Sequence, residues 1–153
     1  MDKPSGAPCR YLGASHGCTI HDRREQRGFR GCMHYSCLGA GQRVTQEVFD
    51  GRSWKDDQSL LEPMMEAFRG MRLVHDLLLL MNEAANLPLE PRERREHQRL
   101  RMELRPAEGW TEASLGEFER GATPSEIRRF LSSLKSTAAR QREQAKQAAG
   151  RAL

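Results

Sequence analysis

Apolar side chains recur at intervals of three and four residues along much of this chain, which is the spacing of one face of an α-helix. The strongest pattern predicts a helix from about Gln58 to Asn86, with Pro63 in its first turn and Leu87-Pro88 closing it. Its apolar positions are Leu61, Met64, Met65, Phe68, Met71, Leu73, Val74, Leu77, Leu78, Met81 and Ala85. Methionine at core spacing among leucines is typical of packing, so we interpret Met64, Met65, Met71 and Met81 as core residues and not as copper ligands.

Shorter helices are expected on both sides of this one. Val44, Val48 and Phe49 predict a helix over residues 42–49, and Asp50-Gly51 is a stop and turn signal. Residues 91–105 carry alternating charges with few apolar positions, which predicts a solvated helix with His97 on its surface. Residues 110–118 have the pattern of a further short helix after a linker.

The last predicted helix begins at a capping signal. Thr123 is a suitable N-cap, Pro124 suits the first helical position, and Glu126 completes a capping box. The expected apolar stripe comprises Ile127, Phe130, Leu131, Leu134, Ala138 and Ala139. Beyond Ala139 this stripe is lost, and we expect the tail to fray into solvent.

The first forty or so residues have a different make-up. Residues 1–41 hold all four cysteines and seven of the 13 glycines, which is typical of a loop-rich segment without an apolar core. We therefore predict a mainly α protein in which an irregular, Cys-rich, metal-binding N-terminal module is followed by helices. The predicted parts are the module at 1–41, a helical region at 42–105 packing on it, a linker and short helix at 106–123, and a basic C-terminal helix with a frayed tail at 124–153.

Composition and charge limit the partners and the compartment. The net charge of +4 is a modest excess of 25 basic over 21 acidic residues, so nucleic acid binding through the basic C-terminal helix is permitted but not implied, and a protein partner is expected. The longest apolar run, Leu77 to Met81, is too short for a membrane span, and we expect no membrane association. The N-terminus lacks the apolar stretch of a secretory signal, which predicts the reducing cytoplasm.

Cysteine spacing supplies the candidate chemistry. Cys9, Cys18, Cys32 and Cys37 each lie beside glycine or proline, residues that allow a chain to wrap closely around an ion. Four thiolates complete a tetrahedral zinc site, and an iron-sulfur cluster is the alternative cofactor. His21 and His34 lie near the cysteines and are candidate substitute ligands. The competing interpretation is that the cysteines are small, partly buried packing residues.

These residues also carry a family resemblance. The segments Cys9-x-Tyr-Leu, Cys18-Thr-Ile-His21 and residues 27–32 and 35–42 resemble the cysteine-rich head of bacterial pentapeptide-repeat proteins. They are similar, more distantly, to the YkgJ-like family of zinc- or iron-chelating cysteine-cluster proteins. The resemblance implies metal binding. Longer relatives have further cysteines upstream, and many have repeats downstream, neither of which is present here. We therefore expect either a shortened member or a sequence whose start has been placed too late.

No complete catalytic constellation accompanies the cysteines. The chain has no phosphate-binding glycine loop and no His-Glu-x-x-His helix, and a nucleophilic Ser36 or Cys37 would need a positioned histidine and a third orienting group. We therefore expect no catalytic residues and a structural or interaction role for a small metal-binding protein. The alternative is a redox protein or enzyme that uses an iron-sulfur cluster or a reactive cysteine.

Overall fold

The computed structural model describes residues 6–15, 17–141 and 143, and the chain divides into two compact units, Met1–Gly39 and Ala40–Leu153. The described residues are mainly helical, as the sequence predicts. Their only β-type pairing is an isolated antiparallel bridge between Leu12 and Cys18. Each unit is described by itself below. The predicted packing of the helical region on the N-terminal module therefore stays a prediction.

The first unit consists mostly of loops. Its regular elements are the 3₁₀-helix η1, His21–Arg23, and the short helix α1, Arg30–His34. The rings of Tyr11 and Phe29 meet edge to face with centroids 5.5 Å apart, which ties the loop around residue 11 to the start of α1. Among the described residues of this unit, Ile20 alone is buried.

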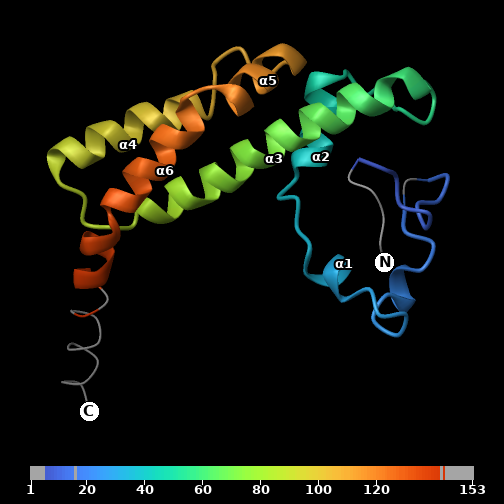
Figure 1. Cartoon of the computed structure of the whole chain (residues 1–153), viewed down its shortest axis with the longest axis horizontal. Coiled ribbons are helices and arrows are strands. Elements are labelled where there is room, and N and C mark those ends of the chain that lie inside the picture. Colours follow the sequence, from blue (N-terminus) through green and yellow to red (C-terminus); the bar gives the residue numbers. More distant parts are fainter. Residues whose placement is uncertain (1–5, 16, 142, 144–153) are drawn as a thin grey trace. The chain divides into compact units, whose positions relative to one another are not determined.

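The second unit is built on one long helix (Figure 1). The helices α2, Ala40–Arg43, and α3, Leu61–Ala84, are joined through the π-helix η2, Val44–Val48, and the 3₁₀-helix η3, Gln58–Leu60. They are followed by α4, Pro91–Glu103, α5, Glu112–Arg120, and α6, Thr123–Ser133. Contacts join α3 to each of the helices α2, α4, α5 and α6, so α3 forms the centre of the core.

Two predicted helices are confirmed within about two residues. The helix expected over residues 58–86 is η3 followed by α3, and it ends at Ala84. Its buried residues include Met64, Met71 and Met81, so these three methionines are core residues as predicted, whereas Met65 is only half-buried. The helix expected over residues 42–49 is present as α2 and η2, but it begins at Ala40 and widens into a π-turn.

The prediction of a solvated helix at residues 91–105 is wrong in part. The helix forms, but Leu100 and Leu104 are fully buried and His97 is only 5% exposed. Nε2 of His97 donates to the carbonyl oxygen of Met81, 2.7 Å away, and its ring lies 6.3 Å from that of Phe130 in α6. His97 is therefore not a surface residue, because it links α4 to α3 and packs near α6.

The C-terminal helix also differs from expectation at its start. Thr123 is its first residue, and the N-cap is Ala122, whose side chain makes no capping bond. The Thr123–Glu126 capping box is thus wrong, although Pro124 does lie in the first turn. Ile127, Phe130 and Leu134 are buried as predicted, and helical positions continue through residues 135–141. Most of the tail predicted to fray lies outside the described residues.

The short helix predicted at residues 110–118 is present as α5. Its N-cap, Thr111, exchanges hydrogen bonds with Ser114, and a turn closed by the Gly109 amide and the Pro106 carbonyl precedes it. Trp110 is only 7% exposed, and its ring meets that of Phe118 edge to face at 5.2 Å. The segment between α4 and α6 is therefore packed by its aromatic residues.

Candidate functional site

Cys9 and Cys18 lie on one tight loop of the first unit. The Leu12–Cys18 bridge and a bond from the Gly13 amide to the Gly17 carbonyl, 2.8 Å, bring the two arms of this loop together. The sulfur of Cys9 accepts a hydrogen bond from the Tyr11 amide at 3.4 Å. Cys9 is half-buried and Cys18 is exposed. The loop thus places two thiols on neighbouring arms with solvent access.

Cys32 and Cys37 lie on α1 and on the turn after it. The amide of Cys32 bonds to the carbonyl of Phe29, so the ring contact between Phe29 and Tyr11 connects this helix to the loop of Cys9. After Cys37 the backbone passes through positive φ at Leu38 (53°) and Gly39 (82°). A leucine in that region costs conformational energy, so the turn is held by its surroundings.

The two candidate histidines differ in their surroundings. Both ring nitrogens of His21 already have partners: Nδ1 lies 3.1 Å from Asp22 Oδ1, and Nε2 lies 2.8 Å from Arg24 Nη2. A metal at either nitrogen would have to displace one of them. His34 ends α1 and is exposed.

The structure does not gather the predicted ligands into one cluster. Within the described part of the chain, no group of three or more histidine, cysteine, aspartate and glutamate side chains is arranged to hold a metal ion. All four cysteines are free thiols. The donor chemistry fits zinc or an iron-sulfur cluster, but this arrangement would have to contract to bind either.

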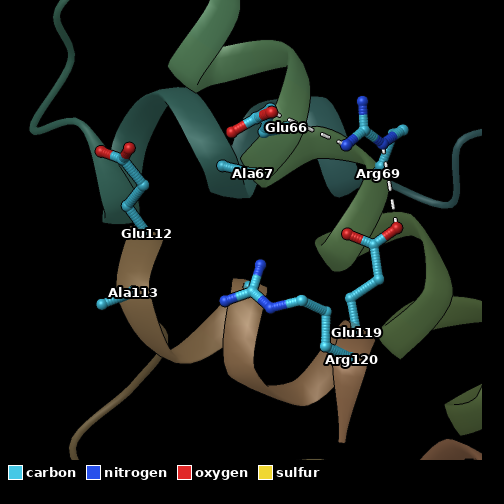
Figure 2. Close-up of a pocket in the computed structure, with 8 residues that line it drawn as sticks. Glu66, Ala67, Arg69, Glu112, Ala113, Glu119 and Arg120 are labelled. Carbon is cyan, nitrogen blue, oxygen red and sulfur yellow. Dashed lines mark ion pairs between the residues drawn. The ribbon is translucent and has the colours of Figure 1, made fainter.

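A second candidate, which the sequence analysis missed, is a groove between α3 and α5 in the second unit (Figure 2). It has a volume of about 390 Å³. Its lining is mostly charged: Glu66, Ala67, Arg69, Glu112, Ala113, Gly116, Glu119 and Arg120. The guanidinium of Arg69 lies 3.9 Å from Glu66 and 3.8 Å from Glu119. Exposed pairs at such distances contribute little stability, so these side chains can be redirected by a ligand.

Small residues make this groove. A Cβ atom on Gly70 of α3 would lie 3.1 Å from the Cβ of Leu115, so glycine is what lets α5 approach α3 this closely. The guanidinium of Arg120 lies over Gly116, where a Cβ would be 3.2 Å from Nη1. A glycine inside an otherwise good helix pattern was the one signal of a close approach in the sequence.

The carboxyl groups with shifted pKa values lie outside both candidate sites. Hydrogen bonds from Arg43 lower the pKa of Glu47, those from Ser59 lower that of Asp57, and those from Arg99 lower that of Glu96. Arg99 also reaches Glu126, 3.3 Å away, and so joins α4 to α6. These shifts have structural causes, and none of them marks a catalytic group.

Comparison with known proteins adds one relative. The chain is 36% identical over 89 residues to the uncharacterized protein YybG of Bacillus subtilis (strain 168). The match covers 58% of this chain and 32% of YybG, so the chain spans about a third of the relative it matches. No protein-family model and no solved structure matches the chain. Among the described residues, no helix combines the length and apolar character required to cross a membrane.

Proposed function

We propose that the first unit is a cytoplasmic metal-binding module in which Cys9, Cys18, Cys32 and Cys37 ligate zinc, or alternatively an iron-sulfur cluster, in a structural or interaction role. The observation that carries this proposal is the lack of a core. Ile20 alone is buried among the described residues of this unit, while Met33, Tyr35 and Leu38 are 45%, 60% and 40% exposed. Apolar packing is therefore a weak source of order here.

A comparison of folding free energies explains why a bound metal ion could order this unit. Ordering the backbone costs about 1–2 kcal/mol per residue, and burying a side chain such as that of Ile20 contributes only about 1.5–3 kcal/mol. A structural zinc site contributes on the order of 10 kcal/mol. Folding of this unit and metal binding would then be a single event, in which the loop of Cys9 and Cys18 closes on α1 and the turn after it.

The local contacts support such a closure. The Leu12–Cys18 bridge and the Tyr11–Phe29 ring contact already relate both halves of the ligand set. The hydrogen bond from the Tyr11 amide to the Cys9 sulfur is of the kind that orients a metal-bound thiolate. A module of this kind accords with the resemblance to cysteine-rich heads of bacterial pentapeptide-repeat proteins, which we retain as part of the proposal. A protein partner is the expected target.

Metal analysis tests the proposal directly. Protein purified under reducing, oxygen-free conditions should carry about one zinc per chain, or show the visible absorbance of an iron-sulfur cluster. Chelation should make residues 9–40 exchange amide hydrogens rapidly and leave the α3 helix protected. The variants Cys32→Ser and Cys37→Ser should lose the metal and show the same rapid amide exchange over residues 9–40.

The matched control is Met33→Ser, which removes an exposed sulfur next to Cys32 that is outside the proposed ligand set. This variant should keep its metal. Metal-free wild-type protein with residues 9–40 still protected would contradict the proposal.

A redox role is the second candidate, and the exposure of the free thiols of Cys18 and Cys32 favours it. It predicts rapid alkylation of these two residues in metal-replete protein, whereas thiolates bound to zinc should be protected. Mass spectrometry after iodoacetamide treatment distinguishes the redox role from the zinc-binding role.

A further inference from the structure

An apolar groove lies in the second unit, between the end of α3 and α6 with the helical positions that follow it. The groove has a volume of about 360 Å³. The side chain of Gln141 donates to the Asn86 carbonyl, 3.3 Å away, and so ties the two walls together at one end. The apolar residues that line it are Leu80, Ala84, Leu87, Leu131, Leu134 and Ala138. This groove therefore differs from the α3–α5 groove, whose lining is mostly charged.

Leu80 gives this groove an exposed apolar surface. Its side chain is 50% exposed, and it lies among the other apolar residues of the lining. Leu79, the residue before it, is 47% exposed but does not line the groove. Single exposed leucines are common on protein surfaces, whereas a contiguous apolar surface marks a site of contact with another molecule.

The two charged residues of the groove have opposite signs and lie on opposite walls. Glu83 belongs to α3, and Lys135 to the helical positions after α6. Both are exposed, and in the described part of the chain neither forms an ion pair. A partner surface with a single sign of charge would leave one of them unpaired.

A second copy of this chain matches both charges. Two copies related by a two-fold axis present the same surface to each other, so every contact between two different residues occurs twice. An acid on one wall and a base on the other suit this symmetry, because Glu83 of each copy can face Lys135 of the other. The groove is therefore complementary to itself in charge as well as in apolar character.

We propose that this groove is the contact surface of a reversible homodimer, in which Leu80 of each copy packs against the apolar lining of the other and Glu83 faces Lys135. The net charge of +4 makes two copies repel each other at long range, so these local contacts must supply the attraction. Because the groove is small, we expect a dissociation constant of about 1–100 μM. The proposal is independent of metal binding, since all of these residues belong to the second unit.

The first test compares two neighbouring leucines. Sedimentation velocity of the full chain over a wide concentration range, with a reductant to exclude disulfide-linked dimers, measures the dissociation constant. Leu80→Gln should weaken dimerisation at least about tenfold, because each dimer loses two buried leucines. Leu79→Gln, the matched control, should weaken it less than about twofold. Leucine and glutamine have similar helix propensities, so neither substitution should disturb α3, and circular dichroism checks this.

The second test exchanges the charges. Glu83→Lys and Lys135→Glu should each weaken dimerisation about threefold to tenfold, because each homodimer then contains two like-charge contacts. An equimolar mixture of the two variants should associate about as well as the wild type, because every such contact in the mixed dimer joins a lysine to a glutamate. A charge pair within one chain would not produce this recovery.

Each test has an outcome that overturns the proposal. Wild-type protein that stays monomeric at every concentration would do so, and so would equal weakening by Leu79→Gln and Leu80→Gln. A mixture of the charge variants that associates no better than either variant alone would show that Glu83 and Lys135 do not meet across a two-fold axis.

Discussion

Replacement of Leu100 by alanine tests whether α4 is part of the core or a solvated helix. The Leu100 side chain is fully buried, whereas Met102, two positions along the same helix, is 74% exposed. Leu100→Ala should therefore lower the free energy of unfolding by about 2–5 kcal/mol, through lost apolar burial and the cavity left behind. Met102→Ala should change it by less than about 0.5 kcal/mol.

The pair is well matched because leucine and methionine have similar helix propensities, so the small gain from alanine cancels in the comparison. A loss of about 3 kcal/mol corresponds to a fall of about 6–12 °C in melting temperature for a chain of this size. Urea unfolding followed by far-ultraviolet circular dichroism measures the free energy. It reports mainly on the second unit, where most of the helix lies. If the two variants differed by less than about 1 kcal/mol, α4 would not be packed on the core and the assignment of Leu100 would be wrong.

Three further predictions follow from individual contacts. His97→Ala should lower the free energy of unfolding by about 2–3 kcal/mol, because the hydrogen bond to Met81 and the ring packing are both lost. His75 is only half-buried, so His75→Ala should lower it clearly less in the same urea experiment. Phe68→Ala should lower the free energy of unfolding by about 1–3 kcal/mol, because the Phe68 ring is half-buried beside Gly41. A loss above about 4 kcal/mol would show that the ring is fully buried. The bond from Arg43 lowers the pKa of Glu47 below its ordinary value of 4.5, so its stabilisation is present above about pH 4.5 and is lost as the pH falls through the lowered value. Glu47→Gln should accordingly destabilise the protein at pH 7, and this effect should shrink as the pH falls below about 4.5. An effect that stays constant as the pH is lowered would refute the ion pair.

The candidate site shows where prediction from this sequence ends. Glycine and cysteine placement identified a segment without a core, and the exposure of its apolar residues agrees with that interpretation. Whether four thiols converge depends on contacts between residues far apart in sequence, and no local pattern encodes these. The α3–α5 groove was missed for the same reason: it is lined by residues from segments tens of positions apart, such as Arg69 and Glu119.

Local patterns by themselves determined the helical class and the approximate position of every main helix from Ala40 onward. The long apolar stripe of α3 and the breaks at Gly51, Pro88 and Pro106 were sufficient for this, because helix periodicity and chain breakers act over a few residues. Tertiary structure decided which faces are buried. His97 and Leu100 lie in a sequence so highly charged that it predicts a solvated helix, yet α3 and α6 cover one face of it. Burial depends on which helices meet, and only the folded arrangement of the chain specifies that.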